Sequence, residues 1–142
     1  MSASESPLLP SPERIHELLE RNLREVFEEA DGERRLAAVN ALWTPDGILY
    51  VPPGPVTGHE AIAKFAGDLR ETHPTYTYTP HGRTQVLHDA GRLAWGSGPT
   101  GEEAVYTGLD LVIARDDKIA ALYVFLDESS DEYRRSSGKR DT

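Results

Sequence analysis

The sequence predicts an α+β fold in which three helices cover one face of a long, curved antiparallel sheet and enclose a conical cavity. Three observations indicate this class. Apolar residues recur at helical spacing only in the first half of the chain. After His73-Pro74 the pattern changes to the alternation typical of half-buried strands. Turn sequences then follow one another at the regular spacing of consecutive hairpins.

The chain is long enough for one domain with a substantial core, because it has 142 residues. Residues 1–10 and 128–142 are rich in Ser, Pro and charged residues and have no periodic apolar pattern. We expect both ends to be disordered tails. The predicted domain therefore spans residues 11–127.

Composition excludes several classes of function. The formal net charge of −9 is unfavourable for a nucleic-acid surface, and the absence of cysteine rules out disulfides and thiolate metal sites. The five histidines are scattered without metal-ligand spacing, so neither a metal nor a cofactor is expected. No apolar run reaches membrane-spanning length, and the first residues do not resemble a secretory signal. We therefore expect a cytoplasmic protein with no nucleic-acid or membrane partner.

Two helices are predicted before residue 44. A hydroxyl cap at Ser11 followed by proline predicts the start of the first helix, whose apolar residues continue to about Ala30. The second helix is predicted over about residues 33–43. Its apolar face ends in Trp43 and also carries the polar Asn40, which is therefore expected to point inward.

A short strand and a third helix follow. Residues 47–51 predict a strand that ends at a run of prolines. Thr57 and Glu60 have the spacing of a capping box, with Thr57 as the cap of the third helix. The apolar face of that helix includes Phe65.

The second half of the chain reads as a meander of antiparallel strands. Alternation of apolar and polar residues, separated by Gly- and Asp-containing turns, predicts strand segments over residues 75–79, 83–87, 92–97, 103–114 and 119–126. With helices segregated from these strands, the helices are expected on one face of the sheet.

Asp110 is the most informative residue of the meander. Four of the five residues from 109 to 113 are large aliphatics, so both faces of this strand are expected to be partly buried. Burial disfavours an ionised carboxylate and raises its pKa unless it is paired or hydrogen-bonded. A neutral acid there can donate a proton or a hydrogen bond to a carbonyl oxygen. The alternative is a structural carboxyl bonded to Asn40, Trp95 or a backbone amide.

Four local segments, in this order and spacing, identify a family resemblance. They are Leu42-Trp43-Thr44-Pro45-Asp46-Gly47, Thr57-Gly58-His59-Glu60-Ala61-Ile62, Leu93-Ala94-Trp95, and the stretch from Gly108-Leu109-Asp110 to Phe125-Leu126-Asp127. Over residues 12–127 the chain resembles the nuclear transport factor 2-like superfamily, in particular its SnoaL-like and ketosteroid-isomerase-like branches. The fold alone does not define chemistry, since it carries enzymes, binding proteins and adaptors.

The resemblance implies a conical pocket and a homodimer formed through the outer face of the sheet. Asp110 matches the position where ketosteroid isomerases hold a protonated aspartic acid in the oxyanion hole, and where SnoaL-type cyclases hold a general acid. Other features depart from these enzymes. Val51 lies where the isomerase base is expected, residues 12–30 contain no tyrosine, and residues 121–125 lack the acid of the related epoxide hydrolases. Ketosteroid isomerase and limonene-type epoxide hydrolase activities are therefore disfavoured.

A set of mostly apolar residues is expected to line the pocket beside Asp110. Each could equally be part of a packed core. The predicted ligand-binding residues are Asn40, Trp43, Val51, Phe65, Trp95, Tyr106 and Val124.

The leading functional hypothesis is a cofactor-free isomerase-, cyclase- or lyase-type enzyme that acts on a small, largely apolar carbonyl compound, with Asp110 as acid or oxyanion donor. The alternative is a non-catalytic protein that binds a small hydrophobic ligand, or a dimeric interaction module. A closed, fully packed cone with Asp110 bonded only to protein would count against catalysis.

Overall fold

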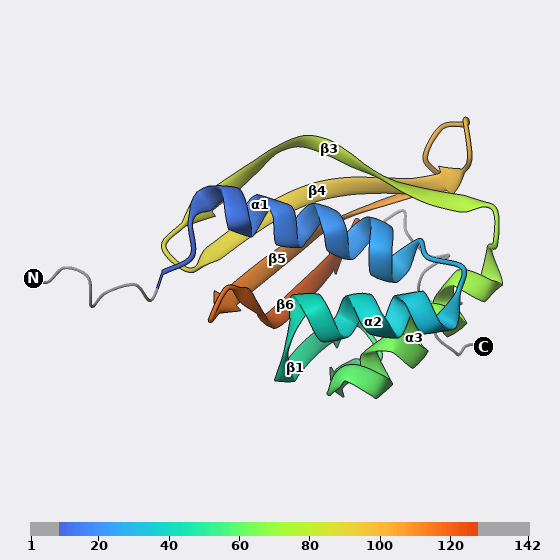
Figure 1. The fold of residues 1–142 in the computed structure, drawn as a ribbon. Coiled ribbons are helices and arrows are strands. Elements are labelled where there is room, and N and C mark those ends of the chain that lie inside the picture. Colours follow the sequence, from blue (N-terminus) through green and yellow to red (C-terminus); the bar gives the residue numbers. More distant parts are fainter. Residues whose placement is uncertain (1–8, 128–142) are drawn as a thin grey trace, which may run out of the picture.

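The computed structural model describes residues 9–127 and confirms the predicted α+β class (Figure 1). Apart from residues 9 and 10, the two predicted tails lie outside the described residues. The helical segments are α1 (Pro12–Arg21), η2 (Asn22–Phe27), α2 (Gly32–Leu42) and α3 (His59–Thr72). The strands are β1 (Trp43–Val51), β2 (Gly54–Thr57), β3 (Tyr76–Leu87), β4 (Ala90–Pro99), β5 (Tyr106–Arg115) and β6 (Lys118–Leu126).

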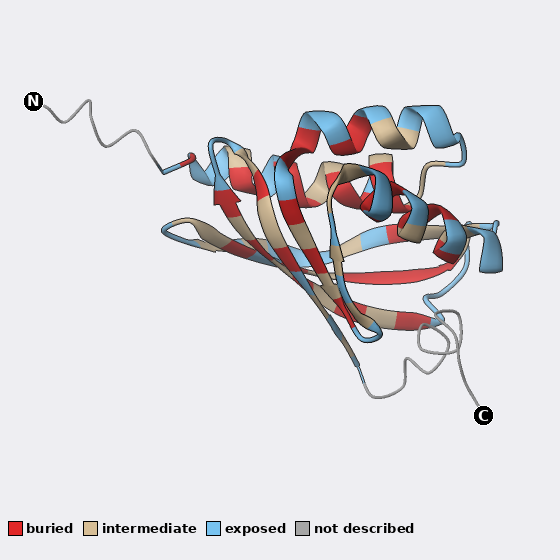
Figure 2. Ribbon diagram, turned by 90° about the horizontal axis from the view of Figure 1, so that it is seen from below, coloured by how far each residue is buried: buried red, intermediate tan, exposed pale blue. Residues whose placement is uncertain are grey.

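All strands of the described chain form one curved sheet in the order β2-β1-β6-β5-β4-β3. β3 to β6 form the predicted antiparallel meander. β1 pairs with β6 in parallel, so the sheet is mixed and the expectation of a purely antiparallel sheet is wrong. The helices lie on one side of this sheet (Figure 1), and buried residues alternate with less buried ones along its strands (Figure 2). The hydrophobic core is therefore the space between the helices and the concave sheet face.

The first helical stretch has its predicted start but not a uniform geometry. Ser11 caps α1, and its Oγ accepts a hydrogen bond from the backbone N–H of Arg14 at 3.0 Å. From Asn22 to Phe27 the chain continues as the π-helix η2. A π-helix contains more residues per turn than an α-helix, so its side chains shift in phase relative to the preceding turns. Leu23 and Phe27 of this segment are buried.

The junction between α2 and β1 differs from the prediction. Trp43 does not end a helix; it is the first residue of β1 and has extended backbone angles. The turn expected at residues 44–47 is an irregular part of this strand, whose register with β6 shifts between Trp43 and Ile48. Gly47 is needed there because a Cβ atom would lie 2.7 Å from the Trp43 ring.

The predicted capping box is wrong. Thr57 is the last residue of β2 and pairs with Ile48, while α3 begins after Gly58 without a side-chain cap. His59 instead joins this region to the end of α2. Its Nδ1 lies 2.6 Å from Asn40 Oδ1, and its Nε2 lies 3.0 Å from the Trp43 carbonyl oxygen.

The strands expected at residues 75–79 and 83–87 are one continuous strand, β3. Its pairing with β4 is irregular between His81 and Gln85, and Gly82 has a φ of +89°, which favours glycine. The sequence pattern placed a break where the structure has a bulge. β5 begins at Tyr106, three residues later than expected, and keeps Asp110 near its centre.

Candidate active site

Asp110 is held on the concave face of the sheet by the alternation of β5. Residues 106, 108, 110, 112 and 114 are buried, whereas the residues between them are half-buried on the outer face. Asp110 pairs with Leu93 on β4 and Val124 on β6, and it is only 3% exposed. The predicted burial of this carboxyl is therefore confirmed.

One side chain hydrogen-bonds to the carboxyl within residues 9–127. Trp95 Nε1 donates to Asp110 Oδ1 over 2.9 Å. Burial raises the pKa of Asp110 from 3.8 to about 7, and the hydrogen bond from Trp95 opposes this rise. Asp110 is thus an acid that gains and loses its proton close to neutral pH.

The space beside Asp110 is very small. It is lined by Leu23, Phe27, Tyr78, Trp95, Asp110 and Val124, and its volume is about 10 Å³. That is the scale of a single water molecule. The open ligand pocket expected from the resemblance is therefore not present among the described residues.

Aromatic rings fill the sheet face next to this cavity. The ring of Trp95 lies 5.3 Å from that of Tyr78 and 5.8 Å from that of Tyr106, the latter in a T-shaped arrangement. The two tyrosine hydroxyl oxygens are 3.1 Å apart. Phe27 packs edge-on against Tyr78 at 6.1 Å. These contacts hold Trp95 in place beside Asp110.

The structure brings together only part of the predicted site. Trp95 and Val124 line the cavity with Asp110. Tyr106 lies on the same face of β5, two residues before the Gly108 that pairs with Trp95, and its ring contacts the indole. These three placements follow from strand alternation, which the sequence shows directly. Their roles toward a ligand stay predictions.

The other predicted lining residues lie elsewhere. Trp43 is buried away from the cavity, and its Nε1 donates to Asn22 Oδ1 at 2.9 Å. Val51 is buried in the core and pairs with Gly54, while Phe65 is half-buried against the core.

Asn40 is exposed and contacts His59, so its predicted inward orientation is wrong. Val39 and Leu42 of the same turn of α2 are buried in the core, so Asn40 lies on the side of the helix that faces His59 and solvent.

Three cavity residues were not predicted. Tyr78 alternates with hydroxyl residues on β3, and this alternation was the signal that could have identified it. Leu23 and Phe27 come from η2; helical spacing predicts Phe27 on the apolar side of this stretch but does not place either residue beside Asp110. No local pattern in the sequence marks the change to a π-helix.

Gly108 is a further residue that the site requires. A Cβ atom at this position would lie 2.6 Å from the Trp95 ring. We expect Gly108→Ala to displace the indole, weaken its hydrogen bond to Asp110 and destabilise the protein by about 1–3 kcal/mol, as overpacked cores do. Urea unfolding followed by tryptophan fluorescence measures this effect. Gly32→Ala on α2 is the matched control, because its Cβ would meet only Arg35 at 3.8 Å; equal stability of the two variants would contradict the prediction.

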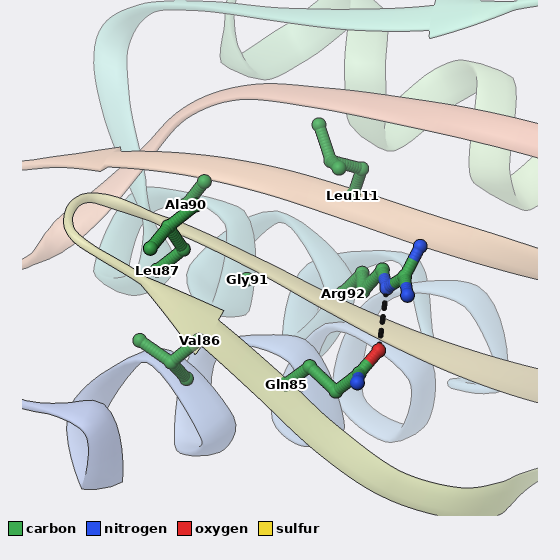
Figure 3. A pocket seen from close by; sticks show the side chains of 7 residues that line it. All are labelled: Gln85, Val86, Leu87, Ala90, Gly91, Arg92 and Leu111. Atoms are coloured by element: carbon green, nitrogen blue, oxygen red, sulfur yellow. Dashed lines mark hydrogen bonds between the residues drawn. The ribbon is translucent and has the colours of Figure 1, made fainter.

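A larger hollow of about 390 Å³ lies at the β3–β4 hairpin (Figure 3). Its lining includes Leu87, Arg92 and Leu111, and Arg92 Nε donates to Gln85 Oε1 at 2.6 Å. Leu111 faces the opposite side of the sheet from Asp110, since successive side chains of a strand alternate. This hollow is therefore separate from the cavity and contains none of the predicted site residues.

Within residues 9–127, no three His, Asp or Glu side chains gather closely enough to hold a metal ion. In the same part of the chain, no helix has the length and apolar character needed to cross a membrane.

Helices on the concave face of an unclosed, curved six-stranded sheet define the cone-shaped class of nuclear transport factor 2-like proteins. Within this class the chain belongs to the SnoaL-like domain family, whose model matches residues 23–122. Among curated proteins, no sequence matches the chain significantly.

Several solved structures share the fold. A proposed isomerase of the SnoaL-like family from Agrobacterium tumefaciens str. C58 has a TM-score of 0.75 and 22% identity, over 81% of this chain and 98% of that one. A proposed SnoaL-like polyketide cyclase from Jannaschia sp. CCS1 has a TM-score of 0.71 and 17% identity, over 92% of this chain and 98% of that one. A proposed ketosteroid isomerase from Kribbella flavida DSM 17836 has a TM-score of 0.61 and 16% identity, over 82% of this chain and 79% of that one.

A de novo designed protein with a curved β-sheet matches as well, with a TM-score of 0.69 and 19% identity over 90% of this chain and 98% of the design. Backbone similarity at this level of identity therefore shows the fold and not an activity. The function has to be argued from the side chains around Asp110.

Proposed function

We propose that the protein is a cofactor-independent enzyme of the isomerase, cyclase or lyase type, in which Asp110 acts as an acid toward a small, largely apolar carbonyl compound. The names of the SnoaL-like structural relatives support this class of reaction. A cytoplasmic location is part of the proposal.

The proposal rests mainly on the protonation of the Asp110 carboxyl near neutral pH. Burial in an aromatic and aliphatic environment raises its pKa to about 7, which is the range in which a general acid works best at neutral pH. Structural carboxyls in proteins are usually ionised and paired. Asp110 has no cationic partner among the residues that line the cavity.

The same lining limits the chemistry. Apart from Asp110, it contains no carboxylate and no histidine. Proton donation to a carbonyl oxygen, which stabilises negative charge that develops there, is the step that this set of residues supports. A reaction that needs a second carboxylate as base is not supported.

Ligand entry requires movement, because about 10 Å³ does not hold an organic molecule. Leu23 and Phe27 are the cavity residues contributed by the π-helix η2, an irregular geometry that is frequent at functional sites. We propose that these two side chains are displaced when a ligand enters.

A second candidate function is favoured by the small cavity itself. If the cone stays packed and Asp110 bonds only to Trp95, the protein is a non-catalytic binding or interaction module of the same fold. The two candidates differ in whether a carbonyl compound reaches Asp110.

A panel of compact ketones tests the proposal. 2-Tetralone, cyclohex-2-enone and ethyl acetoacetate are incubated with the protein in D₂O, and proton NMR follows deuterium exchange at the carbon next to the carbonyl. An acid that polarises the carbonyl accelerates this exchange. Saturable acceleration by the protein supports the enzyme. Absence of acceleration and of any ligand-induced change in tryptophan fluorescence favours the second candidate.

We also propose a homodimer formed through the outer face of the sheet. On that face Tyr123 is 36% exposed and stacks on Tyr50 with ring centroids 4.4 Å apart, and Phe125 is 55% exposed. Half-buried Leu109 and Leu111 lie on the same face, opposite Phe125 and Tyr123. An apolar sheet face of this kind indicates a protein contact.

The dimer is expected to dissociate when charge is added to this face. Sedimentation is expected to show a dimer for the wild type and a monomer for the double variant Tyr123→Arg, Phe125→Arg, because like charges would meet across the interface. Leu9→Arg is the control, since Leu9 is also exposed but lies outside the sheet. A wild type that is monomeric at high micromolar concentration would contradict the dimer.

A further inference from the structure

We propose that Trp95 is a positioning residue that determines which oxygen of Asp110 carries the proton: its indole holds Oδ1 as an acceptor, so that the proton resides on Oδ2 and is presented to the carbonyl oxygen of the ligand. This inference deepens the proposed function and rests on it. It specifies which oxygen of Asp110 donates the proton. It also requires a hydrogen-bond acceptor on the part of the ligand that contacts Asp110.

The chemistry of the two groups gives the direction. An indole N–H can only donate a hydrogen bond, and Trp95 Nε1 donates to Oδ1 over 2.9 Å. A protonated carboxyl has one hydroxyl oxygen and one carbonyl oxygen, and the carbonyl oxygen is the better acceptor. Oδ1 is therefore the carbonyl oxygen, and Oδ2 carries the proton that the ligand receives.

The indole cannot easily turn away from Asp110. It lies against Gly108, where even a methyl group would approach the ring to 2.6 Å. The rings of Tyr78 and Tyr106 pack against it at 5.3 and 5.8 Å. The donor is therefore fixed before a ligand arrives, which is what an efficient acid site requires.

No other charged group among the described lining residues competes for this role. From η2 the carboxyl faces Leu23 and Phe27, and from β6 it faces Val124. Tyr78 on β3 is the one other titratable side chain of that lining. The Trp95 hydrogen bond stabilises the ionised carboxyl and so lowers its pKa, whereas burial raises it. Loss of the indole N–H is thus expected to raise the pKa further.

Infrared spectroscopy of Trp95→Phe tests the assignment without any substrate. The protonated Asp110 carboxyl is identified as the carbonyl band that is present in the wild type and absent in Asp110→Asn. A carbonyl that loses a hydrogen bond absorbs at higher frequency. We expect the band to move to higher frequency in Trp95→Phe, and its titration midpoint to move to higher pH. Trp43→Phe is the matched control, since it removes another buried indole N–H that bonds to Asn22 and not to Asp110.

An unchanged band and midpoint in Trp95→Phe would overturn the inference. A second measurement needs no change at Trp95, in case that variant does not fold. In the wild type the NMR signal of the Trp95 indole N–H should titrate with the midpoint of Asp110, and a signal that is independent of pH there would also overturn it. Either result leaves the ketone exchange test unaffected, so failure of the inference is distinguishable from failure of the proposed function.

Discussion

Asp110→Asn is expected to lower the turnover of a carbonyl substrate by about 100- to 10,000-fold, the usual contribution of a general acid. Asparagine has nearly the same shape as a neutral aspartic acid. Its oxygen can accept the Trp95 hydrogen bond that Oδ1 now accepts at 2.9 Å. The amide cannot release a proton, so the fold and the affinity for the ligand should be retained while the chemical step slows.

The matched control is Asp116→Asn, which makes the same chemical change at an exposed turn. Deuterium exchange into the ketones compares the two variants with the wild type, and circular dichroism verifies the fold. If Asp110→Asn retains full turnover, Asp110 is not the acid. If it fails to fold at all, Asp110 is a structural residue and the non-catalytic candidate gains support.

The stability of the wild type is expected to fall as the pH rises toward 7. The pKa of Asp110 is 3.8 in its ordinary environment and about 7 in the folded protein. Between these values the folded state holds a proton that the unfolded state has released. The contribution of the neutral carboxyl is therefore complete below pH 3.8 and is lost as the pH rises through about 7. Each pKa unit corresponds to about 1.4 kcal/mol, so the loss is of the order of 4 kcal/mol.

Urea unfolding from about pH 5 to about pH 8 measures this dependence. Other carboxylates titrate as well, so the informative quantity is the difference in free energy of unfolding between the wild type and Asp110→Asn. Asparagine does not ionise, and the variant should therefore become the more stable protein above pH 7. A difference that is independent of pH would mean that Asp110 titrates normally and is open to solvent.

The two predictions are linked by the position of one carboxyl. A buried carboxyl that has no cationic partner lowers the stability of the folded protein near neutral pH. Such a group is unfavourable in a core that has only a structural role. Its presence next to Trp95, Tyr78 and Phe27 is the strongest argument for function in this chain. The small cavity is the strongest argument against catalysis, and the ketone experiment decides between them.

The spacing of apolar residues along the chain was sufficient to predict much of the fold. Helical periodicity before residue 73 and strand alternation after it predicted the α+β class. The aliphatic run around Asp110 predicted its burial, because a strand with apolar residues at both parities is covered on both sides. The same alternation placed Trp95, Tyr106 and Val124 on the face of Asp110.

Long-range contacts decided what the pattern could not show. The parallel pairing of β1 with β6 joins strands that are distant in sequence. Asn40 points to His59 and not to Asp110, because the packing of α2 against α3 sets the rotation of that helix.

The burial of Asp110 and the identity of its strand neighbours could thus be predicted from the amino-acid sequence, since both follow from a period of two along the chain. The amount of space beside the carboxyl could not be predicted in this way and is known from the folded structure. That space depends on how Leu23 and Phe27 of the π-helix pack against Tyr78 and Trp95. Packing volume is a property of all these side chains together, and no periodic pattern in one segment encodes it.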